Sequence, residues 1–241
     1  MKIAVCVSGI SSRVPEYQKV IDLQRKVFGE YDFFFQQWEG YPKPDVPNCI
    51  YTPEPTWDYH CIIEAEQKPD CPIYQRYTRP GGKIERKGLR KQFTYSANQI
   101  ISHTDLVESL PEEYTHIIKT RFDTLVSSKV DFKPYIEMLL DDWNIGFYQG
   151  GKDNPTPEHT LTEYDHTGPR CQWRLFDHLL FHPRDRLKNV YKLKEEKKLL
   201  GAEWGWYQLL VHQWDDYKYK NVVGGESLLK CTRQPYQWDQ F

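Results

Sequence analysis

The stretch that decides the fold is THIIKTRFDT, residues 115–124. Its short apolar run with β-branched residues predicts a buried strand over 115–121. The strand delivers a cation, Arg121, and a carboxylate, Asp123, to its carboxyl end, the edge where open α/β sheets bind ligands. Because strand side chains alternate, both groups should lie on the same side. A ligand site and a salt bridge that caps the strand fit these residues equally well.

Upstream of this stretch, the sequence predicts a β-α-β start. KIAVCVS, residues 2–8, reads as a buried strand because the run is short, continuous and rich in β-branched residues. A helix is expected from Pro15 to Gly29, with apolar residues at the helical spacing except for Gln24. Residues 31–36 follow as a second strand. This order of elements predicts a parallel sheet.

The remaining elements extend this pattern into a single α/β domain spanning residues 1–241. Further strands are expected at 49–51, 143–149, 174–182 and 217–223, and helices at 57–67, 89–109, 133–141 and 202–214. Residues 150–170 are rich in Gly and Pro. A loop of that length in a compact domain is usually functional or disordered, so we expect a mobile lid or an acceptor-side loop. Residues 224–241 show no period and are expected to be an irregular tail.

Composition argues against several classes of protein. Lys and Arg number 32 and Asp and Glu 34, so bulk charge gives no reason to bind nucleic acid or an anionic membrane. No apolar run approaches ~20 residues, so no membrane span is expected. Aromatic residues make up 15% of the chain and suit stacking on sugars or bases, although a core built of rings is the simpler interpretation. The N-terminal run fits a strand better than a signal peptide, which predicts a cytoplasmic protein with reduced cysteines, among them a buried Cys6.

Common catalytic motifs are absent from the sequence. There is no P-loop, no dinucleotide-binding glycine pattern, no zinc-protease motif and no nucleophile elbow. His159, His166, His178 and His182 lack the tight spacing of zinc ligands. We therefore expect these histidines to be structural or to contact substrate.

The strand-end Arg-x-Asp resembles a variant of the aspartate motif of GT-A type glycosyltransferases. It is most similar to the small transferases of bacterial surface polysaccharide clusters and of large DNA viruses or phages. Other segments agree in order: MKIAVCVSG at the start, Tyr95-Ser96-Ala97-Asn98 before the motif, then Asp177 in RLFDHLLFHP and Glu203 in GAEWGWYQLL. The resemblance spans roughly residues 1–215 as a pattern of short motifs.

The resemblance implies a mainly parallel GT-A sheet flanked by helices, with a nucleotide-sugar donor at the strand ends. The expected donor-binding residues are Ser8, Gly9, Arg13, Lys91, Arg121 and Asp123. Asp123 would also hold a divalent cation, Mn²⁺ or Mg²⁺. The usual motif has two acidic residues, whereas Arg121 stands in the first place here. Dependence on a metal therefore stays open.

The implied function is transfer of a sugar from a nucleoside-diphosphate sugar to a glycan or another hydroxyl acceptor. Glu203, at a predicted helix start, is the first choice for the base that deprotonates the acceptor, and Asp177, predicted in mid-strand, is the alternate. Two other functions remain open. One is a sugar-binding module without catalysis, and the other is a nucleic-acid modifying enzyme that uses the basic segment 76–91.

Overall fold

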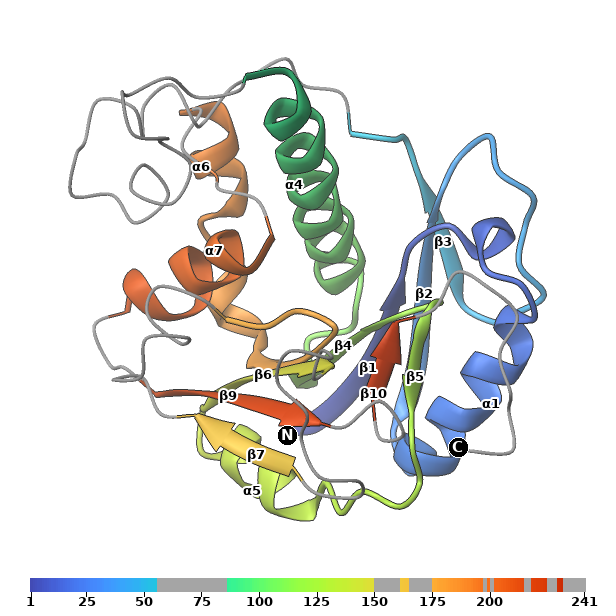
Figure 1. Cartoon of the computed structure of the whole chain (residues 1–241), viewed down its shortest axis with the longest axis vertical. Coiled ribbons are helices and arrows are strands. Elements are labelled where there is room, and N and C mark those ends of the chain that lie inside the picture. The colour runs from blue at the N-terminus through green and yellow to red at the C-terminus, as the bar shows by residue number, and fades with distance from the viewer. Residues whose placement is uncertain are drawn as a thin grey trace.

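The centre of the molecule is an eight-stranded sheet (Figure 1). The computed structural model describes residues 1–55, 86–149, 161–164, 175–196, 199, 202–214, 218–224 and 229–231, with side chains in the long helix described from Ala97 onward. The strands of the large sheet are β1 (Lys2–Ser8), β2 (Asp32–Trp38), β3 (Cys49–Thr52), β4 (Tyr114–Arg121), β6 (Asn144–Gln149), β7 (Leu161–Tyr164), β8 (Leu179–Pro183) and β9 (Tyr219–Gly224). A small second sheet pairs β5 (Thr124–Val126) with β10 (Leu229–Cys231).

The strand order is β3-β2-β1-β4-β8-β6-β9-β7. The first four strands are parallel to one another, β8 runs antiparallel to both β4 and β6, and β7 runs antiparallel to β9. Because β6 pairs with β9 in parallel, six of the eight strands share one direction. This arrangement confirms the prediction of a mainly parallel sheet.

Helices cover both faces of the sheet. They are α1 (Tyr17–Phe28), α4 (Arg86–Glu108), α5 (Lys133–Leu140), α6 (Val190–Glu195) and α7 (Ala202–Tyr207), with short turns η1 (Ser11–Arg13), η2 (Arg184–Leu187) and η3 (Gln208–His212). Residues of α1 and α5 belong to one buried apolar cluster, and residues of α4, α6 and α7 belong to the other. Figure 1 shows α1 and the pair α4 and α7 on opposite sides of the strands.

Strand β1 is buried on both faces, which explains its unbroken apolar sequence. Val5 and Val7 pack in the cluster of α1 and α5, whereas Ala4 and Cys6 pack in the cluster of α4 and α7. All four side chains are fully buried. A central strand between two helical layers has no polar face, so its sequence cannot alternate.

Several predicted boundaries were wrong. Asp177 does not lie in mid-strand, because β8 begins only at Leu179. Residues 161–164 lie within the predicted lid but form β7, paired with β9; the rest of the lid falls outside the described residues. The first helix begins at Tyr17, since Glu16 adopts a left-handed φ of 54°. The predicted helix 57–67 also lies outside the described residues.

The C-terminal part differs from the prediction as well. The single helix expected at 202–214 is a short α-helix, α7, continued by the π-helical turn η3. Within the expected tail, residues 229–231 form β10 and pair with β5. Among the described residues, no helix is both long and apolar enough to cross a bilayer.

Candidate functional site

A cleft of about 300 Å³ opens at the carboxyl ends of β1, β2 and β4. Its lining comprises Ser8, Gly9, Ile10, Arg13, Val14, Gln36, Trp38, Gln99, Ser102, Arg121, Phe122 and Asp123. Strand register explains the gathering, because Ser8 is paired with Gln36 on one side and with Arg121 on the other. The structure thus brings together five of the six residues predicted to bind the donor.

Gly9 shapes the floor of this cleft. Its φ of +136° lies in the region that only glycine adopts readily, and its N–H donates to the Gln36 carbonyl oxygen at 3.2 Å. The chain therefore leaves β1 beside the end of β2. Beyond Gly9, Ser11 is held by Gln37, whose side-chain oxygen accepts from both the backbone N–H and the hydroxyl of Ser11.

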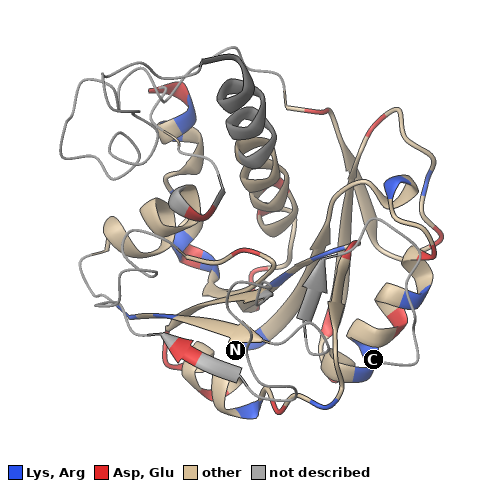
Figure 2. Cartoon of the chain, viewed as in Figure 1, with Lys and Arg blue, Asp and Glu red and all other residues tan. Residues whose placement is uncertain are grey.

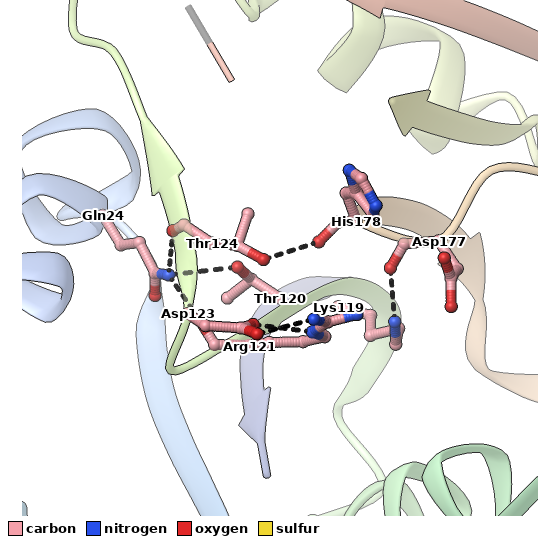
Figure 3. A network of polar contacts seen from close by, with 8 residues as sticks. All are labelled: Gln24, Lys119, Thr120, Arg121, Asp123, Thr124, Asp177 and His178. Atoms are coloured by element: carbon pink, nitrogen blue, oxygen red, sulfur yellow. Dashed lines mark hydrogen bonds and ion pairs between the residues drawn. The ribbon is translucent and has the colours of Figure 1, made fainter. Parts of the chain in front are cut away.

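Arg121 and Asp123 form a two-pronged ion pair (Figure 3). Arg121 Nε donates to Asp123 Oδ1 at 2.7 Å, and Nη2 donates to Oδ2 at 2.7 Å. The side chains are only 16% and 9% exposed. The prediction that both groups lie on the same side is confirmed, and the predicted salt bridge at the strand end is present. Such forked, charge-assisted bonds fix geometry more strongly than single bonds do.

Gln24 of α1 supports the turn that carries this pair. Its amide nitrogen lies 3.1 Å from Thr120 Oγ1, 2.9 Å from the Arg121 carbonyl oxygen and 2.8 Å from the Thr124 carbonyl oxygen. Gln24 is fully buried. The sequence signal was available: Gln24 is the one polar residue on an otherwise apolar helical face, and a buried polar group needs partners.

A second segment near the end of β4 is 175–178, which leads into β8. Lys119 Nζ donates to the Asp177 carbonyl oxygen at 2.6 Å, and Thr124 Oγ1 donates to the His178 carbonyl oxygen at 3.1 Å (Figure 3). The His178 ring stacks on Tyr148, with 4.6 Å between centroids. Side chains of β4 and β5 thereby anchor the backbone that presents Asp177 and His178.

The charge states of Asp177 and His178 are set by burial and by neighbouring charges. Burial acts to raise the pKa of Asp177, but the nearby Lys119 and Arg121 outweigh burial and hold the pKa below its usual value. Asp177 is thus a carboxylate at neutral pH. Burial lowers the pKa of His178 to about 4, although Asp177 acts in the opposite direction, so His178 is a neutral ring at that pH.

The two predicted bases lie outside the lining of the cleft but on adjoining segments. The Leu175 N–H donates to the Glu203 carbonyl oxygen at 3.0 Å, which ties the segment 175–178 to the start of α7. Asp177 interacts electrostatically with both Arg121 and Asp123. Lys91 lies on α4, but its side chain is outside the described residues.

Sequence reasoning missed Gln36. Its Nε2 donates to Thr52 Oγ1 at 2.8 Å, while its Oε1 is buried and has no hydrogen-bond partner among the described residues. Gln36 lines the cleft and is fully buried. Buried polar atoms normally have partners, so this amide is suited to a ligand. A polar pair, Gln36-Gln37, directly after an apolar strand was the available signal.

The residues at the strand end do not fit a protein-held divalent cation. Mg²⁺ and Mn²⁺ prefer several carboxylate, carbonyl or water oxygens. Both oxygens of Asp123 already accept N–H groups of Arg121, and a cation placed there would meet the guanidinium charge. No cluster of three His, Cys, Asp or Glu side chains suited to a metal occurs within the described part of the chain.

Comparison with solved structures fixes the type of fold. The chain is similar to the 4-diphosphocytidyl-2C-methyl-D-erythritol synthase of Anaerococcus prevotii DSM 20548, with a TM-score of 0.54 and 11% identity over 97% of this chain and 93% of that one. The fold is of the GT-A and nucleotidyltransferase type. No family model matches the chain, and no curated protein matches it by sequence.

Glycosyltransferases are also found among the similar structures. A glycosyltransferase involved in glycosylation of the major capsid of PBCV-1 has a TM-score of 0.45 and 9% identity, covering 94% of this chain and 82% of that one. S. aureus TarS, residues 1–349, has a TM-score of 0.45 and 9% identity, covering 94% of this chain and 61% of that one.

Proposed function

We propose that this protein transfers a sugar from a nucleoside-diphosphate sugar to a hydroxyl acceptor. The observation that carries the proposal is the cleft at the carboxyl edge of a GT-A type sheet, where Ser8, Gly9, Arg13, Arg121 and Asp123 meet. These residues are the ones that the resemblance to GT-A glycosyltransferases assigns to the donor. The same resemblance implies that the acceptor is a surface polysaccharide or another glycan.

The cleft offers each part of such a donor a chemically suitable partner. Gln36 presents a buried amide that can hydrogen-bond the edge of a nucleobase. Trp38 and Phe122 also line the same cleft, and the ring of Trp38 can pack against a base or a sugar. Arg13 and Arg121 supply positive charge for a diphosphate.

The transfer step needs a base as well as a stabilised leaving group. The bond between the anomeric carbon and the diphosphate oxygen breaks, a bond to the acceptor oxygen forms, and the acceptor proton passes to a carboxylate. The two candidate carboxylates are Asp177 and Glu203, on segments joined by the bond from Leu175. Asp177 is kept ionised by Lys119 and Arg121 against the effect of burial, since its pKa is lowered.

A panel of uridine, guanosine, cytidine and thymidine diphosphate sugars tests the proposal. The protein is incubated with each donor and with mixed glycan acceptors, and the released nucleoside diphosphate and glycosylated product are measured by mass spectrometry. We expect one nucleotide class to give both products. Donor binding without any released nucleoside diphosphate would instead identify a sugar-binding module.

A second candidate is synthesis of a nucleoside-diphosphate compound, because the name of the Anaerococcus prevotii enzyme describes that kind of product. The two functions differ in the small product. Sugar transfer releases a nucleoside diphosphate, whereas synthesis from a nucleoside triphosphate and a phosphate ester releases pyrophosphate. Incubation with nucleoside triphosphates and sugar phosphates, followed by a pyrophosphate assay, distinguishes them.

Nucleic-acid modification receives less support from the described surface. Figure 2 shows Lys and Arg interspersed with Asp and Glu along the described elements, whereas proteins that bind nucleic acid usually gather basic residues on one face. The basic side chains of 76–91 lie outside the described residues.

A further inference from the structure

The Arg121–Asp123 pair stands where the resembled motif has two carboxylates. Each Asp123 oxygen accepts one N–H at 2.7 Å, and neither side chain is more than 16% exposed. A guanidinium carries five N–H donors in a rigid plane, and this fork engages two of them. The plane of the guanidinium is therefore fixed in a wall of the cleft by Asp123.

The charges of the cleft favour an anion. The charged residues among the described part of its lining are Arg13, Arg121 and Asp123, two positive and one negative. Behind them, Lys119 balances the Asp177 carboxylate, because Lys119 and Arg121 together lower the pKa of Asp177 in spite of its burial. A divalent cation would be placed among like charges here, whereas a diphosphate would meet opposite ones.

Resting on the proposed function, we infer that the guanidinium of Arg121 binds the donor diphosphate in place of a divalent cation. Asp123 then acts as a positioning residue, since it contacts Arg121 and holds the guanidinium toward the cleft. A fixed cation of this kind stabilises the negative charge that grows on the leaving diphosphate as the sugar bond breaks. Donor binding by this protein is independent of metal ions.

The first test compares nucleoside diphosphates with and without metal. Binding of UDP, GDP, CDP and dTDP is measured by calorimetry in EDTA and again in Mn²⁺ or Mg²⁺. A cation concentration of about 1 mM is enough to fill an exchangeable metal site. We expect the best nucleotide to bind with the same affinity, within about twofold, in all three buffers. Binding that tightens tenfold or more with Mn²⁺ would overturn the inference and leave the proposed function intact. Binding of no nucleotide in any buffer would overturn both.

The second test separates the diphosphate contact from general damage to the site. Arg121→Gln should weaken binding of the nucleoside diphosphate about tenfold to a hundredfold, the usual effect of losing charged hydrogen bonds, while binding of the matching nucleoside is unchanged. Equal losses for both ligands, or no loss for either, would contradict the inference. Lys220→Gln is the matched control, because Lys220 forms an ion pair with Glu163 at 2.6 Å on the far strands β9 and β7.

The positioning role of Asp123 needs its own measurement. Asp123→Asn should also weaken binding of the nucleoside diphosphate and leave binding of the nucleoside unchanged. In the Arg121→Gln background, the same change should have little further effect, because the two residues act through one contact. Additive losses in the double variant would show that Asp123 acts without Arg121 and would refute its positioning role.

Discussion

Asp123 is the residue on which the chemistry of the strand end most directly depends. We predict that Asp123→Asn lowers release of the nucleoside diphosphate at least about tenfold, because losing a charged fork costs about 1.5–3 kcal/mol. The fold should persist, since the turn is also held by Gln24. Turnover with the best donor and the circular dichroism spectrum check both parts.

The control for this change is Glu163→Gln. Glu163 is likewise a paired carboxylate, bonded to Lys220 at 2.6 Å, but it lies on β7 at the edge of the sheet. Its loss should leave turnover unchanged. Near-normal turnover in Asp123→Asn would remove Asp123 from the mechanism.

A buried pair of histidines, His103 of α4 and His182 of β8, should make stability depend on pH. His103 Nε2 and His182 Nε2 are 3.0 Å apart, and His182 Nδ1 lies 2.9 Å from the Pro183 carbonyl oxygen. That carbonyl can only accept, so His182 carries its proton on Nδ1, and His103 Nε2–H donates to His182. Burial lowers the pKa of both rings, that of His182 to about 4.

We predict that the free energy of unfolding falls as the pH drops below about 6.5. An unfolded histidine titrates near 6.5, so the unfolded chain takes up protons before folded His182 does at about 4. The stabilisation is therefore complete above about pH 6.5 and is lost toward pH 4, at about 1.4 kcal/mol per pH unit for each such ring. Urea unfolding at pH 7.5, 6.5 and 5.5 measures the slope.

The variant His182→Gln should reduce this slope and leave the share of His178, whose pKa is also lowered to about 4, whereas His212→Gln, a change of an exposed histidine, should leave the slope unchanged. Identical slopes for wild type and His182→Gln would contradict the assignment of the effect to the buried pair.

At the scale of elements, the placement of segment 175–178 against the sheet depends on Gly146 of β6. A Cβ at this position would lie 2.5 Å from both the nitrogen and the oxygen of Phe176 and 2.9 Å from Asn221 Oδ1. Asn221 in turn accepts the Phe176 N–H at 2.9 Å. The backbones of β6 and of segment 175–178 are therefore in direct contact at Gly146 and Phe176.

We predict that Gly146→Ala destabilises the fold by about 1–3 kcal/mol, the usual cost of overpacking, and also lowers turnover, because Asp177 must move with Phe176. Gly40→Ala is the contrast. Gly40 has a φ of +81° but no atom within 4 Å of an added Cβ, so its change costs about 1 kcal/mol of strain and should spare turnover. Urea unfolding and donor turnover measure both variants, and normal turnover in Gly146→Ala would refute the coupling.

Elements defined by local pattern were predicted well. The first strand, α1 and β4 have unbroken apolar runs or clear helical spacing, and the edge they share could be inferred from parallel pairing alone. β7 could not be found in this way, since its four residues are paired with β9, some 60 positions away. Likewise, RLFDHLLFH has apolar residues on both sides of Asp177 and His178, and only pairing with β4 and β6 sets the start of β8 at Leu179.

The residues of the candidate site could be predicted from the sequence, but their arrangement in space could not. Arg121 and Asp123 follow a buried strand, so their place and their contact could be expected. Gln36 could be assigned only once Thr52 and the cleft were located, because a glutamine after a strand has no single role. The contact of Asp177 with Lys119 joins positions 58 residues apart, a separation that no local pattern reports.

At the scale of the whole molecule, the proposed donor site and the candidate bases come from different parts of the chain. Every described residue that lines the cleft lies between positions 8 and 123, whereas both candidate bases, Asp177 and Glu203, come later in the chain. We predict that Glu203→Gln keeps donor affinity and loses transfer, because only proton removal is affected. Calorimetry with the nucleoside diphosphate and a transfer assay measure the two properties separately.

Asp177→Asn is the companion variant for this prediction. Normal transfer in Glu203→Gln together with lost transfer in Asp177→Asn would reverse the assignment. A product with retained configuration would mean that neither carboxylate need act as an inverting base.

The central position of β1 also has a consequence for biosynthesis. Cys6 is paired in register with Phe34 and with Lys119, yet Lys119 is translated about 110 residues later, which at ~5–20 residues per second takes roughly 6 to 20 s. During that interval one edge of β1 has no partner, and the face carrying Cys6 is without the C-terminal half of its helical cover. Alkylation of ribosome-bound chains should therefore label Cys6 until the C-terminal part of this cover has emerged, and the thiol should become inert once that part packs on β1. β1 is thus completed and covered by elements that follow it in the chain, and Cys6 is a built-in reporter of that moment.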